Sequence, residues 1–157
     1  MSKHADIARE LIAQNTYMAL GTADAAGEPW VSPVFYTPDG HHDFYWVSSP
    51  ETLHSRNIAV RPRVAITIFD SRCAIGTAEA VYMSAEAAPV PDGELAAAVG
   101  LFNAKLPEGR RFGPEELRAP ALFRLYRATV LEHSILIRGG DPELGPAHDS
   151  RLTVRLP

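Results

Sequence analysis

The amino-acid sequence predicts a mainly β, α+β domain, in which an antiparallel sheet or small barrel carries helices on its outside. Three observations support this fold class. Short runs of β-branched and aromatic residues recur along the chain and are separated by turn residues. Successive runs lie close enough to pair as hairpins, without the regular strand–helix alternation of a doubly wound sheet. The 157 residues contain no repeat or linker, so residues 1–157 are expected to form one domain.

A helix opens the chain and three strands follow it. Ser2 is a favourable N-cap, and Ile7, Leu11 and Ile12 fall on one face of the helix that it begins. Strands are expected at Tyr17–Ala23, Trp30–Tyr36 and Asp43–Ser48. Pro33 predicts an edge or bulge position for the second strand, because proline cannot donate to the ladder.

The same signals predict the remaining elements. Residues 38–40 (Pro-Asp-Gly) form a turn sequence, and a helix with Pro50 at its first position is expected to end near Val60. Asp92 is expected to cap a third helix that reaches about Lys105. Its apolar stripe suits core packing or a dimer face and consists of Leu95, Val99, Phe102 and Leu106. The other expected elements are a short helix at Pro114–Arg118 and strands at Val64–Phe69, Ala78–Ala87, Leu122–Val130, Ser134–Ile137 and Leu152–Leu156.

Composition excludes several classes of protein. The net charge of −4 argues against a nucleic-acid partner, and no apolar stretch is long enough to cross a bilayer. Cys73 is the only cysteine, which excludes intramolecular disulfides and cysteine-based zinc sites. The adjacent His41 and His42 are expected to be solvated turn residues, so no metal is predicted. The polar N-terminal segment lacks an apolar signal core and predicts a cytoplasmic protein.

The segment where the third strand turns into the second helix could bind an anion. The first N–H groups of a helix lack internal partners, and the helix dipole places partial positive charge there. Hydroxyl and basic side chains are concentrated at this turn: Ser48, Ser49, Thr52, Ser55, His54 and Arg56. A phosphate monoester suits this group of donors. A well-capped surface helix without a ligand is the alternative interpretation.

Two tryptophans lie close to this turn along the predicted sheet. Trp46 directly precedes it, and Trp30 lies on the neighbouring strand, so either ring could face a flat ligand. For either tryptophan alone, a core aromatic is the favoured interpretation. Together with the anion turn, however, they favour a phosphorylated planar cofactor. The sequence contains no nucleophile elbow and no dinucleotide or nucleotide-hydrolase fingerprint, so no catalytic residue is assigned.

Five segments in this order and spacing resemble the pyridoxamine 5'-phosphate oxidase-like family of FMN-binding split β-barrels. The segments are Met18–Thr22, Gly27–Val34, Phe44–Ser48, His54–Ile58 and Pro62–Val64. The similarity covers residues 1 to about 90 well and the remainder loosely. It implies an antiparallel split β-barrel with flanking helices that forms a homodimer, with FMN held in a cleft between the subunits.

The resemblance also implies which residues contact the flavin. The second strand would line the ring with Trp30, Val31, Ser32, Pro33 and Val34. The third strand and following helix would contribute Trp46, Val47, Ser48, Thr52, Leu53, His54 and Arg56. His54 stands where the family has a phosphate-binding lysine, and Leu53 replaces an arginine of the family.

Residues further along the chain match the family less well. Ala80 stands in place of a flavin-contacting glutamine, and residues 146–151 only partly match the substrate motif of true pyridoxamine phosphate oxidases. His148 and Arg151 of that segment are expected near the cofactor cleft, but vitamin B6 oxidation is not expected.

The resulting hypothesis is an FMN-dependent oxidoreductase without an assigned substrate or electron donor. One alternative keeps the fold but uses a deazaflavin, whose acidic tail would meet a basic groove formed by Arg56, Arg61 and Arg63. Another is a non-catalytic flavin- or haem-binding module, with His133 or His148 as the axial ligand of the haem.

Overall fold

An eight-stranded antiparallel sheet organises the chain, whose computed structural model describes residues 2–157. Residue 1 of the expected domain lies outside this range. The strands are β1 (Tyr17–Ala23), β2 (Pro29–Phe35), β3 (Thr37–Asp39), β4 (Asp43–Ser48), β5 (Arg63–Phe69), β6 (Ala80–Pro89), β7 (Arg124–Ile137) and β8 (Ser150–Val154). They follow the order β2-β1-β5-β6-β7-β4-β3, with β8 paired to β7.

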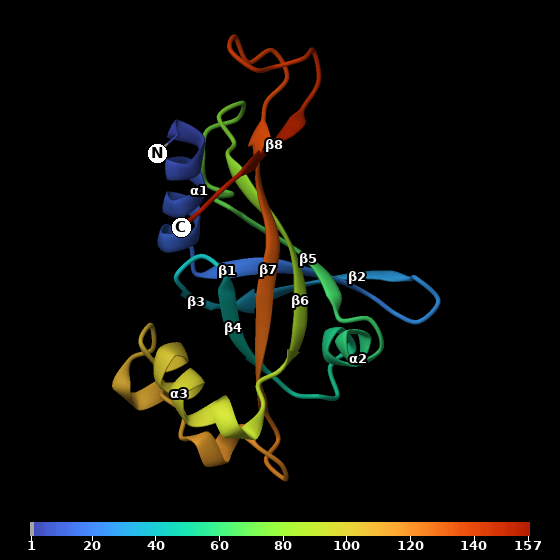
Figure 1. The fold of residues 1–157 in the computed structure, drawn as a ribbon, viewed down its shortest axis with the longest axis vertical. Helices are drawn as coiled ribbons and strands as arrows, with labels where there is room; N and C mark the ends of the chain where they lie inside the picture. Colours follow the sequence, from blue (N-terminus) through green and yellow to red (C-terminus); the bar gives the residue numbers. More distant parts are fainter. Residues whose placement is uncertain (1) are drawn as a thin grey trace.

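The sheet curls strongly, so that it forms a half-barrel (Figure 1). Only Tyr36 separates β2 from β3, which brings the two ends of the strand order together along the chain. Pro33 lies in β2 at the end of that order, as the edge-strand prediction requires. Every strand pair is antiparallel, so the predicted fold class is confirmed at the level of an α+β antiparallel half-barrel.

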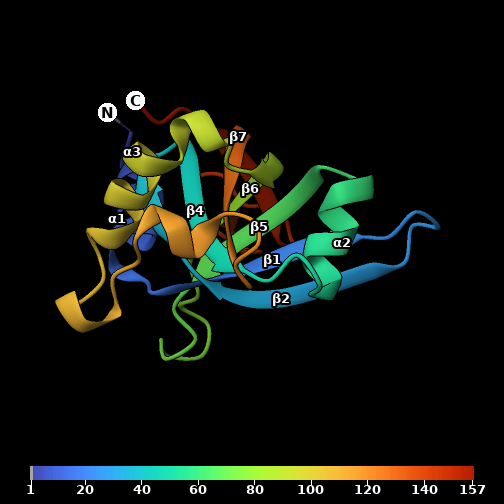
Figure 2. The same ribbon diagram turned by 90° about the horizontal axis from the view of Figure 1, so that it is seen from below.

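Three α-helices and two 3-10 helices accompany the sheet within residues 2–157. They are α1 (Lys3–Gln14), α2 (Leu53–Val60), α3 (Asp92–Asn103), η1 (Glu108–Arg110) and η2 (Pro114–Leu117). Figure 2 shows α2 and α3 on opposite sides of β4, an arrangement also visible in Figure 1. No helix in the described part of the chain has both the length and the apolar character needed to span a membrane.

Two apolar clusters fill the fold. The larger lies inside the curled sheet, where alternate residues of β1, such as Met18 and Leu20, point inward. The smaller joins α3 and η2 to β4 and β7 and includes Leu95, Val99 and Phe102. The apolar stripe of the third predicted helix therefore packs into a core.

The structure corrects two predicted helix starts. Ser2 caps α1 as predicted, accepting from the Ala5 N–H at 3.3 Å. The second helix begins after Thr52 rather than at Pro50, because the Thr52 side chain supplies the cap. Asp92 lies inside α3, whose cap residue is Pro91 without a side-chain hydrogen bond.

Two strands also differ from the prediction. The expected turn at residues 38–40 is mostly strand β3, which pairs with β4 through Pro38, and only Gly40 has the positive φ of a turn. The two strands expected at 122–130 and 134–137 form one strand, β7. The register of β6 against β7 shifts between Ser84 and Ala85, and this irregularity absorbs Leu131, which interrupts the alternation of buried and exposed residues.

Candidate functional site

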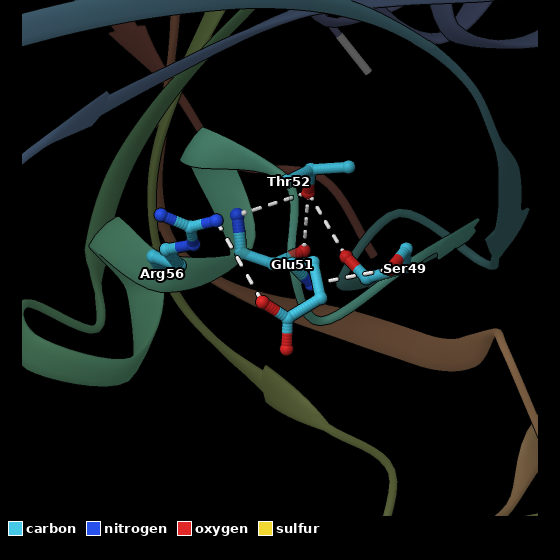
Figure 3. A network of polar contacts seen from close by, with 5 residues as sticks. Ser49, Glu51, Thr52 and Arg56 are labelled. Atoms are coloured by element: carbon cyan, nitrogen blue, oxygen red, sulfur yellow. Dashed lines mark hydrogen bonds and ion pairs between the residues drawn. The ribbon is translucent and has the colours of Figure 1, made fainter.

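The corner between β4 and α2 is held by its own hydroxyl groups (Figure 3). Thr52 Oγ1 accepts from the Ser55 N–H at 3.4 Å and lies 3.0 Å from the Ser49 carbonyl and 2.8 Å from Ser55 Oγ. Ser49 Oγ accepts from the Glu51 N–H at 3.2 Å. Arg56 lies 3.6 Å from the Glu51 carboxylate, and both side chains are exposed. These contacts fix the entry of the chain into α2.

A chain of hydrogen bonds crosses from this corner to β2 through His54. The Nε2 atom of His54 lies 2.8 Å from Ser48 Oγ and 3.2 Å from Thr52 Oγ1. Its Nδ1 atom lies 3.1 Å from Ser32 Oγ. The indole N–H of Trp30 donates to the same Ser32 oxygen at 3.1 Å. One imidazole thus connects β2, the end of β4 and the start of α2.

Burial lowers the pKa of His54 below its ordinary value, because the charged imidazole loses hydration. The side chain is only 9% exposed, so the neutral form prevails near pH 7. The imidazole of His54 therefore offers no lasting positive charge to a ligand, and both of its ring nitrogens already have hydroxyl partners. The unpaired donors at the helix start are the backbone N–H groups of Leu53 and His54, which have no acceptor among residues 2–157.

A cavity of about 900 Å³ begins at this corner. Ser48 and His54 lie at one side of it, with Pro33 and Val34 of β2 and Val47 of β4. The other side belongs to the segment from the end of α3 to η2. The remaining lining residues are Thr16, Tyr17, Phe35, Phe102, Lys105, Leu106, Pro107, Gly109, Arg110, Arg111, Phe112 and Glu116. We refer to this cavity as the β2–α3 groove.

Sequence reasoning missed the basic side of the groove. Lys105, Arg110 and Arg111 face one acidic lining residue, Glu116, in a chain whose net charge is −4. Lys105 Nζ lies 4.7 Å from the centroid of the Tyr36 ring, and partial burial lowers the pKa of this lysine. The accumulation of basic residues at 105–111 was the available signal. Nothing local indicated that this segment folds back against β2.

A second, smaller hollow of about 340 Å³ lies on the outer face of the sheet. Small residues form much of its floor, and at Gly21 an added Cβ would lie 3.3 Å from the Ala65 carbonyl oxygen. Val31 lines this hollow, as does Arg151, whose guanidinium carbon lies 4.0 Å from the centroid of the Tyr82 ring. The structure therefore places Arg151 and Val31 in a different hollow from Ser48 and His54.

Six other predicted site residues also lie outside the groove lining: Trp30, Ser32 and Thr52, which belong to the hydrogen-bond network described above, and Trp46, Leu53 and Arg56. Trp46 is fully buried, and its ring stacks on Tyr126 with centroids 5.5 Å apart. It supports the core here instead of forming a cleft wall, and its Nε1 is buried without a hydrogen-bond partner among residues 2–157. Leu53 is 45% exposed at the first turn of α2, and Arg56 pairs with Glu51 at the surface.

The structure also shows where the residues proposed for a deazaflavin or a haem lie. Arg61 donates to the carbonyls of Asp24 and Ala25 at 2.6 and 2.9 Å, which fastens the β1–β2 hairpin. Neither Arg61 nor Arg63 lines the β2–α3 groove, so this groove is not the basic groove of three arginines expected for a deazaflavin tail. His133 is buried, with Nε2 at 2.7 Å from the His41 carbonyl, and His148 is exposed between β7 and β8.

Comparisons with solved structures show the same fold in proteins of several kinds. A haem-binding protein from Mycobacterium smegmatis has a TM-score of 0.71 at 21% identity, over 98% of this chain and 59% of that chain. This chain therefore spans about three fifths of that relative. The haem storage protein HutZ from Vibrio cholerae has a TM-score of 0.66 at 21% identity, over 89% of this chain and 95% of that chain. An F420 reductase has a TM-score of 0.59 at 19% identity, over 81% of this chain and 95% of that chain.

The sequence itself provides the family assignment. No curated protein matches it. The sequence profile of the family described as pyridoxamine 5'-phosphate oxidase matches residues 5–132, which include every strand except β8 and the end of β7. The matched range contains the β4–α2 corner and the β2–α3 groove. The chain thus belongs to the pyridoxamine 5'-phosphate oxidase family, as a member of its split β-barrel fold.

Proposed function

We propose that this chain binds FMN, with the phosphate at the start of α2 and the ring system along β2, and acts as a flavin-dependent oxidoreductase. One observation carries the proposal: Ser48 and His54, at the start of a helix with free N–H groups, line the β2–α3 groove. Hydrogen-bond donors for an anion therefore lie next to a space that can hold a flat ring. The volume of about 900 Å³ lies in the usual range of ligand cavities.

The donors at the corner fit a phosphate monoester. The N–H groups of Leu53 and His54 point out of the helix start, where the helix dipole favours negative charge. Ser48 brings a hydroxyl group that lines the groove at the same place, and Thr52 caps the helix beside it. A phosphate is held here by several neutral donors, without a lysine.

The ring system would lie against β2, where Pro33 and Val34 line the groove and Trp30 is 48% exposed. Bound flavin supplies hydride or electron transfer. The protein's part is to orient the ring, keep water from one face of it and direct the Ser32 hydroxyl toward it. No side chain is assigned as a general acid or base.

The outer face of the sheet supports a homodimer as part of this proposal. Val31 is 64% exposed and Tyr17 61%, on neighbouring strands of the same face. Large apolar side chains exposed on one face of a sheet favour an interface there. A second copy on this face would cover the hollow that contains Arg151, so a cofactor along β2 would meet residues of both subunits.

The lone, exposed Cys73 suits the cytoplasm, which is the proposed location.

The test is a titration of the purified apoprotein with FMN and with riboflavin, followed by visible absorbance. FMN is expected to bind about tenfold or more tightly than riboflavin, because only FMN carries the phosphate. Ser48→Ala is expected to weaken FMN binding by several-fold, on the order of one lost hydrogen bond, and to leave riboflavin binding unchanged. Equal affinities for FMN and riboflavin would place the phosphate elsewhere and end the proposal.

A deazaflavin-dependent reductase is a second candidate, because Lys105, Arg110 and Arg111 line the far side of the groove. Three basic side chains there suit the long acidic tail of a deazaflavin, and FMN lacks such a tail. The spectrum of the co-purifying cofactor separates the candidates: oxidised FMN is yellow, and a deazaflavin absorbs nearer the ultraviolet. A Soret band would instead indicate a haem-binding module.

A further inference from the structure

His54 links two serine hydroxyl groups that lie on different strands. Its Nδ1 is 3.1 Å from Ser32 Oγ, and its Nε2 is 2.8 Å from Ser48 Oγ. Ser48 lines the β2–α3 groove, whereas Ser32 accepts the indole N–H of Trp30 on β2. The imidazole therefore lies between a groove hydroxyl and a tryptophan that is 48% exposed.

The hydrogen atoms in this series of hydrogen bonds, from Trp30 to Ser48, can be arranged in two ways. A neutral imidazole has one N–H and one lone pair, and an indole N–H can only donate. In the first arrangement, His54 Nδ1–H donates to Ser32, and the Ser48 hydroxyl donates to Nε2. Ser48 then presents only lone pairs to the groove. Thr52 does not replace Ser48 as the donor to Nε2, which lies 3.2 Å from Thr52 Oγ1. Its single hydroxyl hydrogen has two nearer acceptors, Ser55 Oγ at 2.8 Å and the Ser49 carbonyl at 3.0 Å.

The second arrangement reverses every donor except Trp30. Ser32 donates to Nδ1, and Nε2–H donates to Ser48, whose own hydrogen is now free for a ligand. Trp30 donates to Ser32 in both cases. In the second arrangement, however, all bonds run in one direction, from Trp30 through Ser32 and His54 to Ser48. Hydrogen bonds in such a chain polarise and strengthen one another.

We propose that His54 is a positioning residue whose tautomer decides whether Ser48 presents a hydrogen or a lone pair to the groove. An anion at Ser48 accepts a hydrogen, so its binding selects the Nε2–H tautomer and strengthens the hydrogen bond between Trp30 and Ser32. The inference rests on the proposed function, because it takes the anion to be bound at Ser48. It adds that a ligand in the groove is coupled to Trp30 on β2 through one imidazole.

The direct test is the ring nitrogen NMR spectrum of ¹⁵N-histidine-labelled protein, with and without inorganic phosphate. Chloride at the same ionic strength is the control. Phosphate is expected to move the His54 signals to the Nε2–H pattern, and chloride is not. A tautomer that phosphate leaves unchanged would overturn the inference. This measurement uses the unaltered chain, so it does not depend on any variant folding.

Two variants of His54 distinguish a residue that positions the Ser48 hydroxyl from one that only supports the fold. A glutamine amide reaches the position of Nε2 and can still donate to Ser48, whereas an asparagine amide is too short. His54→Gln is expected to keep the FMN affinity within about threefold of the unaltered protein, and His54→Asn to lose about tenfold. A purely structural role predicts equal losses, and equal losses would overturn the inference.

Trp30 supplies an optical readout of the same coupling. The chain has two tryptophans, and the other, Trp46, is fully buried and outside the hydrogen-bond chain. Phosphate is expected to change the tryptophan emission of the unaltered protein but not that of His54→Asn or of Trp30→Phe. An unchanged emission in the unaltered protein would count against the coupling.

The two ideas fail in different ways. If FMN binds as tightly to Ser48→Ala as to the unaltered protein, the phosphate position in the proposed function is wrong. If FMN binding depends on Ser48 while the His54 tautomer stays fixed, the proposed function stands and the coupling is wrong.

Discussion

Burial decides what His54 contributes to its site. A lysine at this position would carry its charge permanently, whereas His54 is held near neutrality between three hydroxyl groups. Losing hydration lowers the pKa of the imidazole, and the hydroxyl groups around it are uncharged. An anion at the start of α2 must therefore be held by many weak donors at fixed positions instead of by one strong charge. Such a site depends on geometry more than a lysine site would.

The lowered pKa of His54 predicts how stability depends on pH. In the unfolded chain the imidazole has its ordinary pKa of about 6.5, so below that pH the unfolded state binds a proton that the folded state resists. The stability contributed by neutral His54 is complete above about pH 6.5 and is lost as the pH falls toward the lower, folded pKa. The free energy of unfolding, measured in urea at a series of pH values, should therefore decrease on acidification.

His54→Gln is the matched variant for this measurement, because glutamine does not titrate. The buried His133 also has a pKa lowered mainly by burial, so the variant should keep part of the pH dependence. The expected result is a shallower decrease of stability below about pH 6.5 in His54→Gln than in the unaltered protein. Identical slopes for the two proteins would show that His54 is not held neutral by the fold.

At the scale of the elements, a buried polar contact between Asn57 and Thr22 fastens α2 to β1. Asn57 Nδ2 donates to Thr22 Oγ1 at 3.0 Å, and the two side chains are 3% and 5% exposed. Asn57→Ala leaves Thr22 buried with one contact fewer and should lower the free energy of unfolding by about 1–3 kcal/mol. Urea unfolding provides the measurement.

A double-mutant cycle tests whether that loss comes from the contact itself. Thr22→Val removes the hydroxyl while keeping the shape of the side chain, so adding it to Asn57→Ala should cost less than Thr22→Val does alone. Strictly additive losses would mean that Asn57 supports α2 by packing only. If the contact positions α2, Asn57→Ala should also weaken FMN binding while riboflavin binding is kept.

The elements show which features the sequence could predict. The ranges Tyr17–Ala23 and Asp43–Ser48 match the predicted strands residue for residue, because alternation and flanking turn residues are local signals. Strand β3 was missed because its proline and the following glycine favour a turn, although it pairs with β4 directly after that turn. The continuity of β7 was missed because it depends on pairing with β6, far along the chain. Trp46 shows the same limit: its sequence neighbours suit a cleft wall, but the curl of the sheet places its ring in the core.

For the whole molecule, the groove arises only when distant segments meet. Ser48 and His54 could be selected from the sequence, because a helix start is recognised locally. Lys105, Arg110 and Arg111 could not, because the α3–η2 segment reaches the groove only by packing on β4 and β7 through the smaller core. The hollow with Arg151 is likewise a product of the sheet, as small residues from neighbouring strands must align to form its floor.

The outer face leads to a prediction about assembly. A second copy packed there would bury Val31 and Tyr17, which are unusually exposed for apolar residues, and would close the hollow around Arg151. Val31→Glu would place a charge in that contact without disturbing the larger core. Sedimentation equilibrium is expected to give a dimer for the unaltered protein and a monomer for Val31→Glu.

Leu122→Glu is the control, because Leu122 is 67% exposed but lies between η2 and β7, outside the hollow. A monomeric unaltered protein, or equal effects of the two substitutions, would show that this face is not where two copies meet, and the cofactor would then be held by one chain alone.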